Sequence, residues 1–195
     1  MDRNVLVGMT TGASIMFGFG IAWLLIGVLV APSSTGLRLA LLLAGIALGV
    51  SVAIMGWRAS RLPRGTVPPT AEQIAAGRAI GRRFGLIFGL ETVAILLAVA
   101  ALNGIHRPDY IPCAIAVIVG LHFFPLAPLF KAPIYNVTGF LGCVIGLAGV
   151  VVADAVFRQE VVSISFGLLL WATTAWIAWK GLVGLRQIAS GLPRI

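Results

Sequence analysis

Charged side chains are scarce in this sequence, and their scarcity excludes most soluble folds. Lys, Arg, Asp and Glu together make up only 10% of the 195 residues, whereas apolar residues make up 59%. A soluble domain usually carries about 25% charged and roughly 45–50% apolar residues. The chain has too few charges to cover a water-facing surface and too many apolar residues to stay disordered. The composition is therefore typical of a protein that crosses a membrane several times.

Acidic residues and cysteines are also few, which excludes further classes of site. The chain has 6 Asp and Glu residues against 14 Lys and Arg residues, and its formal net charge is +8. In a soluble protein this excess favours nucleic acid as a partner, but no basic stretch here interleaves aromatic residues that would stack on bases. Cys113 and Cys143 stand apart in apolar runs, so a structural zinc site is not expected. We predict neither nucleic-acid binding nor a cofactor.

Catalytic motifs are absent as well. The sequence contains no HExxH, GxSxG or phosphate-binding Gly-Lys-Ser/Thr segment. Its two histidines, His106 and His122, are separated by ~24 Å of helix and cannot ligate one haem iron within a subunit. We therefore do not expect an enzyme.

Long apolar runs are what the sequence does contain. A helix that crosses the hydrocarbon core needs about 20 largely apolar residues, and lipid forces backbone groups to bond within the helix. The first run is longer than the apolar part of a typical signal peptide, so we expect it to be retained. We predict an all-α fold, a single integral membrane domain over residues 1–195 built as a bundle of six transmembrane helices in three hairpins. The predicted spans are residues 8–31, 38–57, 82–102, 110–130, 134–154 and 161–181, with a cytoplasmic loop over residues 58–81.

The distribution of basic residues predicts the orientation. With a cytoplasmic N-terminus, 11 Lys and Arg residues lie on the cytoplasmic side and 3 on the outer side. Cytoplasmic loops of multipass proteins carry such an excess. We therefore expect a multipass protein of the bacterial plasma (inner) membrane with both termini in the cytoplasm. Anionic lipid headgroups are the expected partners of the loop arginines, which equally serve as a plain topology signal: Arg58, Arg61, Arg64, Arg78, Arg82 and Arg83.

The third predicted helix carries two patterns. Thr70 and Gln73 have the spacing of a capping box, so this helix is expected to begin there as a cytoplasmic extension of the span. Glycines then recur every four residues and give a smooth face on which another helix packs closely. This face indicates either close packing within the bundle or a homodimer, and Glu91, about 100° away from it, indicates that the helix is central. The four glycines are Gly77, Gly81, Gly85 and Gly89.

Glu91 and His122 are the candidate site residues with the clearest chemistry. Glu91 lies roughly 13 Å beyond the inner interface and His122 roughly 10 Å, at 1.5 Å per residue. Ionisable residues at this depth are costly and face protein or a water-filled cavity. The pair is therefore expected to relay a proton or hold a cation. A purely structural pair, bonded between helices, is the equally weighted alternative.

Two prolines and a following loop extend this candidate site. Pro125 and Pro128 each remove an N–H and free the carbonyl four residues earlier, so a helix break is predicted at residues 120–125. Broken helices at membrane depth line cavities or pack on protein. A kinked helix with a satisfied core histidine is the alternative. Tyr135 and Asn136 follow, where they either bind a solute or cap the fifth helix.

The segment from Gly120 to Leu126, with Lys131 and Tyr135 beyond it, resembles a family of small, uncharacterised bacterial six-span membrane proteins that share a Gly-x-His-x-x-Pro segment. The resemblance implies no activity, but it draws attention to His122 and Pro125. Two functions follow from the whole sequence. One is a small transporter, channel or solute-binding protein with a polar Glu/His site inside the bundle. The other is a non-transport scaffold, regulator or assembly factor whose polar residues are purely structural.

Overall fold

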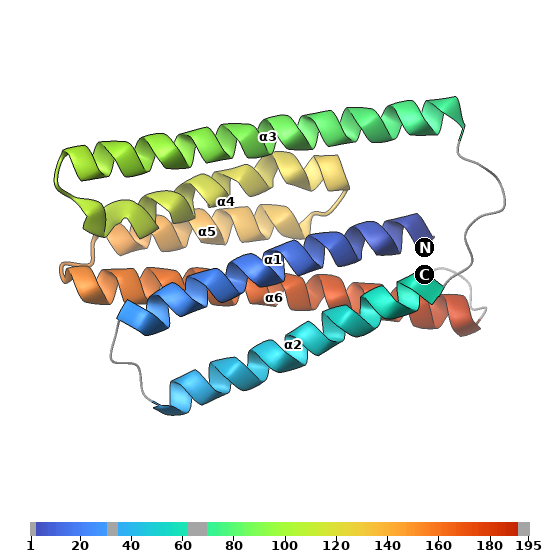
Figure 1. Ribbon diagram of the computed structural model, residues 1–195, viewed down its shortest axis with the longest axis horizontal. Coiled ribbons are helices and arrows are strands. Elements are labelled where there is room, and N and C mark those ends of the chain that lie inside the picture. The colour runs from blue at the N-terminus through green and yellow to red at the C-terminus, as the bar shows by residue number, and fades with distance from the viewer. Residues whose placement is uncertain (1–2, 31–34, 62–69, 191–195) are drawn as a thin grey trace.

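The chain folds into helices that lie side by side. The computed structural model describes residues 3–30, 35–61 and 70–190, and over these residues it contains helices and no strands. Successive helices run in alternating directions, so the beginning of α1 and the end of α6 lie at the same end of the bundle (Figure 1). The predicted all-α fold is confirmed for the described residues. The helices are α1 (Arg3–Val30), α2 (Thr35–Arg61), α3 (Ala71–Gly104), the short 3-10 helix η1 (Pro108–Tyr110), α4 (Ile111–Phe130), α5 (Ile134–Val150) and α6 (Ala155–Ser190).

Five helical segments of the described chain are long and apolar enough to cross a membrane, and they fit a membrane-embedded protein. They are α1, α2, α3, α4 together with η1, and α6. The exception is α5, which has 17 residues. At 1.5 Å per residue it is ~25 Å long, somewhat less than the roughly 30 Å of a hydrocarbon core. The six predicted helices are thus present, but one of them is shorter than its predicted span.

Helical structure replaces much of the predicted loop over residues 58–81. The Thr70 side chain accepts a hydrogen bond from the Gln73 N–H at 3.2 Å, and the Thr70 N–H donates to the Gln73 side chain at 3.0 Å. The predicted capping box is therefore confirmed, and α3 begins at Ala71. The preceding helix extends to Arg61, while Arg64 lies outside the described residues.

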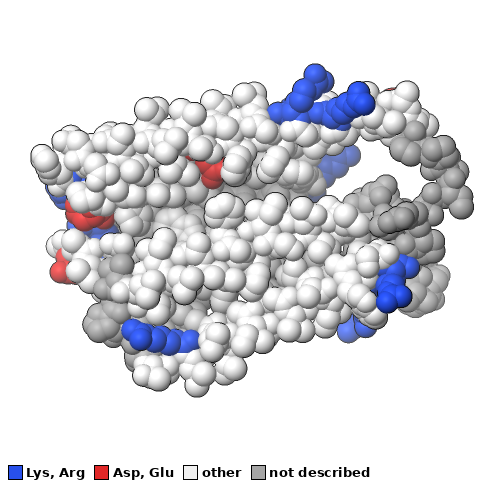
Figure 2. Space-filling model, viewed as in Figure 1, with Lys and Arg blue, Asp and Glu red and all other residues white. Residues whose placement is uncertain are grey.

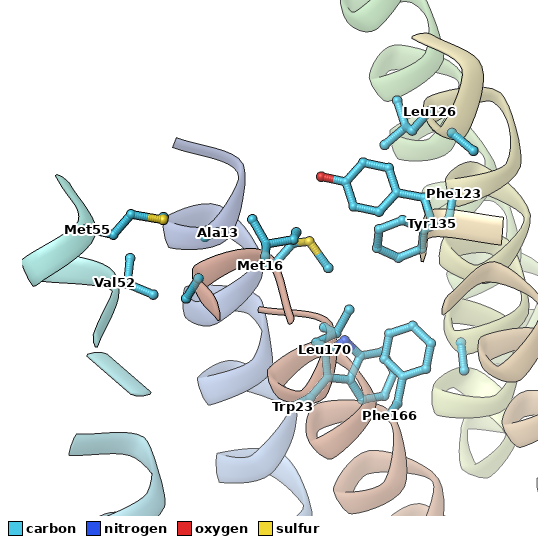
Figure 3. Close-up of a cluster of buried hydrophobic side chains, with 14 of the residues drawn as sticks. Ala13, Met16, Trp23, Val52, Met55, Phe123, Leu126, Tyr135, Phe166 and Leu170 are labelled. Atoms are coloured by element: carbon cyan, nitrogen blue, oxygen red, sulfur yellow. The ribbon is translucent and has the colours of Figure 1, made fainter. Parts of the chain in front are cut away.

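The longest helix, α6, holds the bundle together. It packs along α1 and also contacts α2, α4, α5 and η1. Glycines allow the close approach to α1, because a Cβ at Gly20 would lie 3.3 Å from the Gly167 carbonyl oxygen. Trp171 stacks on Phe17 with ring centroids 5.8 Å apart and donates its ring N–H to the Phe17 carbonyl. Figure 3 shows a cluster of buried apolar side chains, among them Ala13, Met16, Trp23, Val52, Met55, Phe166 and Leu170.

The contact between α4 and α5 is built on glycines. A Cβ at Gly139 would lie 2.7 Å from the Gly120 carbonyl oxygen, and a Cβ at Gly146 would lie 2.7 Å from the Cys113 carbonyl oxygen. Real Cβ atoms essentially never come this close to another atom. The two backbones are therefore in van der Waals contact. In membranes, where no hydrophobic effect drives helices together, small residues allow this close packing.

The third helix, α3, lies at the edge of the bundle and not at its centre. It packs on α4 and η1, and none of its residues is buried (Figure 1). The prediction of a central helix is therefore wrong for the described chain. Lipid does not force an apolar face to be covered, so this helix can leave one open. Its predicted packing face is open too, because a Cβ at any of Gly77, Gly81, Gly85 and Gly89 would meet nothing within 4 Å. Of the two interpretations of these glycines, packing inside the described bundle is excluded, and the homodimer stays a prediction.

Candidate functional site

Glu91 on α3 and His122 on α4 meet at the interface of these two helices. Glu91 Oε2 lies 3.1 Å from His122 Nδ1, and the two side chains are 10% and 9% exposed. Glu91 follows Arg83, and His122 precedes Phe130, by the same ~12 Å of helix. Because α3 and α4 are antiparallel neighbours, equal distances from Arg83 along α3 and from Phe130 along α4 bring the acid and the imidazole to one level.

The pair is close but not hydrogen-bonded. His122 Nδ1 is buried and has no hydrogen-bond partner among the described residues. Its 3.1 Å contact with the carboxylate is therefore a close ionisable pair and not a hydrogen bond. Phe88 and Phe123 approach the imidazole edge-on, with ring centroids 6.5 Å and 5.9 Å away. A buried polar atom without a partner is unusual and needs a physical reason, such as a bound proton, ion or water. The arrangement is therefore suited to taking up a proton or a small cation.

The prolines beyond His122 do not break the helix. Residues 111–130 are continuously helical, with Pro125 and Pro128 inside the helix. The predicted break at residues 120–125 is wrong, because membrane helices tolerate proline where local adjustment and neighbouring helices satisfy the freed backbone groups. The helix ends instead at Lys131, whose φ of 52° and ψ of 40° are left-handed. There the Ala132 N–H donates to the Ala127 carbonyl at 2.9 Å, which closes the final turn.

Tyr135 and Asn136 lie in the first turn of α5 and do not join the pair directly. Tyr135 is buried, and its ring centroid is 5.6 Å from that of Phe123, which in turn contacts His122. Its hydroxyl points away from α4 (Figure 3) and lies 3.4 Å from where a Cβ of Gly12 on α1 would be. Asn136 is exposed, and no side chain caps α5. Of the four predicted ligand residues, the structure brings two together, places Tyr135 one ring away and leaves Asn136 outside.

A groove lies beside the pair, toward the basic end of α3. Its volume is about 260 Å³, and it lies between α3 and α4. Ile87 of its wall is one helical turn before Glu91, and Pro125 is about one turn after His122. The pair itself does not line the groove. The lining residues are Arg83, Leu86, Ile87, Pro125, Pro128 and Leu129.

Arg158 is a structurally important residue, although the sequence distinguishes it only as one of the 3 basic residues on the predicted outer side. It is 2% exposed, and its guanidinium pairs with Asp109 and lies 3.9 Å over the Tyr110 ring. Its Nε donates to the Val152 carbonyl at 2.9 Å, and Nη2 donates to the Ala153 carbonyl at 3.2 Å. Arg158 therefore fastens η1 to the turn between α5 and α6. The available signal was an arginine on the predicted outer side, where basic residues are disfavoured and only 3 are expected.

A known protein family matches the part of the chain that contains this site. Residues 80–180, just over half of the chain, match a family of unknown function (DUF7010). The matched residues run from α3 to α6, so they include Glu91 and His122. No curated protein and no solved structure matches the chain. The predicted resemblance to an uncharacterised family is confirmed in this coarser form, while its signature segment and its bacterial origin stay predictions.

Proposed function

The chain belongs to the family of unknown function DUF7010, and from its residues we propose that it is a small multipass transporter, channel or solute-binding protein. The observation that carries this proposal is the 3.1 Å contact between Glu91 Oε2 and His122 Nδ1, with both side chains about nine-tenths buried. Ionisable residues inside a membrane are expensive and mark pathways of protons, ions or substrates. A buried charge without an opposite charge beside it costs more free energy than a paired one.

A carboxyl and an imidazole at this distance form a unit that is neutral with one proton between them. A second proton gives the pair a net positive charge, and loss of the proton gives it a net negative charge. Because net charge is costly there, proton uptake favours an incoming anion or a departing cation, and proton loss favours an incoming cation. The pair therefore supports proton-linked movement or binding of a small ion or solute, and no catalytic step is proposed.

We propose a bacterial plasma membrane location with both termini in the cytoplasm. The excess of basic residues in the segments that would face the cytoplasm supports this orientation. On the face shown in Figure 2, Lys and Arg side chains lie toward the ends of the molecule and leave the middle nearly free of them. The described arginines at the end of α2 (Arg58 and Arg61) and those of α3 would then meet anionic headgroups at the inner surface.

A non-transport scaffold, regulator or assembly factor is the second candidate. It is favoured by two observations, the uninterrupted α4 and the groove that neither Glu91 nor His122 lines. In this alternative the pair only helps to hold α3 against α4. Among the described helices, α4 is the main contact of α3.

Flux measurements on two variants test the proposed function. Glu91→Gln and His122→Ala should each lower proton-linked flux by at least about tenfold, since either change removes about 1.4 kcal/mol or more of interaction with the transported ion. The measurement is the change of internal pH in proteoliposomes under an imposed ion gradient, between about pH 5 and 8 where imidazole titrates.

The matched control is Glu72→Gln, which neutralises an exposed acid in the first turn of the same helix. Its flux should equal that of the unaltered protein. Unchanged flux in both site variants would rule out the assignment. Lowered thermal stability in both, with no flux in any form of the protein, would favour the scaffold.

A further inference from the structure

We infer that the groove between α3 and α4 binds one anionic phospholipid, with the lipid phosphate at Arg83 and an acyl chain along the apolar wall. The groove has a single charged lining residue, Arg83, and its other lining residues are Leu86, Ile87, Pro125, Pro128 and Leu129. One cation at the end of an otherwise apolar groove complements an amphiphile that carries a negative headgroup. This inference does not depend on the function of the Glu91–His122 pair.

The position of Arg83 along α3 fits the level of a lipid phosphate. It is the last basic residue before the apolar part of the helix, which begins at Phe84. Arginines near the ends of membrane helices place their guanidinium at the interface. From there to Ile87 the groove follows ~6 Å of α3, which accommodates the beginning of an acyl chain.

The wall of the groove is open to the surroundings of the helices. Leu86 is 65% exposed, although it lines the groove. A free phosphate ion would satisfy Arg83 but leave this apolar wall uncovered. A zwitterionic phospholipid would cover the wall, but its choline cation would offset the attraction between its phosphate and the guanidinium. An anionic phospholipid satisfies both, because its phosphate accepts charge-assisted hydrogen bonds and its chain covers the apolar side chains.

The neighbouring arginine provides a natural comparison. Arg82 lines a different hollow, together with Ala75, Arg78 and Gly81. The two arginines are consecutive and lie at the same depth, but they point to different sides of α3. A general attraction of anionic lipids to basic residues involves both equally, whereas the groove involves Arg83 alone.

A bound lipid would lie one helical turn from the candidate site. Ile87 precedes Glu91 by one turn, and Pro125 follows His122 by about one turn. The lipid chain would therefore cover the side of the α3–α4 contact that faces the basic end of α3, so that the lipid keeps water from that side of the pair.

Native mass spectrometry of the whole protein in detergent tests this inference. With dioleoylphosphatidylglycerol, the unaltered protein should bind one lipid more tightly than it binds dioleoylphosphatidylcholine. Arg83→Gln should weaken phosphatidylglycerol binding about fivefold, the effect of one basic contact with an anionic lipid. Arg82→Gln should leave it within about twofold. Leu86→Trp, which fills the groove from an exposed position, should weaken the binding of both lipids.

Three results would overturn the inference. Equal losses in Arg83→Gln and Arg82→Gln would indicate diffuse attraction to the whole basic segment. Displacement of phosphatidylglycerol by inorganic phosphate alone would indicate a free-anion site. Unchanged binding in Leu86→Trp would show that the lipid lies elsewhere. Because Arg83 and Leu86 are exposed, both variants should keep the thermal stability of the unaltered protein.

Discussion

Replacing Gly146 with leucine should strongly destabilise the protein. A Cβ at this position would lie 2.7 Å from the Cys113 carbonyl oxygen and 2.7 Å from the Val117 side chain. The carbonyl belongs to the backbone of α4 and cannot rotate away, so α4 and α5 would have to separate. Overpacking a tight contact costs about 1–3 kcal/mol and occasionally more, and a leucine here should reach about 3 kcal/mol. Unfolding in detergent, followed by circular dichroism, measures the loss.

Gly85→Leu on α3 is the matched control, since it adds the same side chain to a glycine with nothing within 4 Å of its Cβ position. Its free energy of unfolding should stay close to that of the unaltered protein. Equal destabilisation of the two variants would contradict the described packing. Analytical ultracentrifugation of Gly85→Leu also tests the predicted homodimer, which this variant should disrupt if the open glycines form its interface.

Replacing Arg158 with methionine should cost about 3 kcal/mol of stability, because it removes a buried guanidinium that makes several charge-assisted hydrogen bonds. The Asp109 carboxylate loses its buried partner, and the carbonyls of Val152 and Ala153 lose their donors. Tyr110 also loses the guanidinium that lies over its ring. Thermal unfolding measures the total effect, and amide hydrogen exchange at Asp109 and Tyr110 should show that η1 loosens first.

Arg107→Met separates this role from a simple loss of charge. Arg107 pairs with the same Asp109 at 3.4 Å, but its side chain is 51% exposed. Exposed pairs contribute little, so this variant should lower the unfolding temperature far less than Arg158→Met. Equal effects of the two changes would contradict the assignment of Arg158 as the residue that fastens η1 to the turn after α5.

Patterns that depend on neighbouring residues or on depth could be predicted from the sequence. The capping box at Thr70 uses hydrogen bonds within one helical turn, so the spacing of Thr70 and Gln73 was sufficient to predict it. The meeting of Glu91 and His122 followed from depth, because antiparallel helices bring residues at equal distances from one interface to the same level. The sequence does not contain the rotation of each helix about its axis. Depth therefore predicted that the two residues could meet, and not whether they face a cavity.

Glycine patterns show what could not be predicted. Four glycines in α3 formed the more regular pattern, yet a Cβ at any of them would meet nothing within 4 Å among the described residues. Gly142 and Gly146 have a spacing that is common by chance, and they lie in the tight contact with α4. A small-residue face permits close packing but does not require it, since lipid covers an apolar face as well as a helix does. The effect of the prolines in α4 could not be predicted from the sequence either. Proline predicts a missing backbone bond, but the surroundings decide whether the helix breaks.

The packing of α1 against α6 has a consequence for biosynthesis. The Trp171 ring bonds to the backbone of Phe17, a residue 154 positions earlier in the chain. When a ribosome delivers the helices to the membrane in order, α1 leaves the insertion machinery long before its main partner is made. Until then its glycine-lined face must be held by lipid, by α2 or by a chaperone. A nascent chain arrested before α6 should therefore be a preferred target of membrane quality-control proteases.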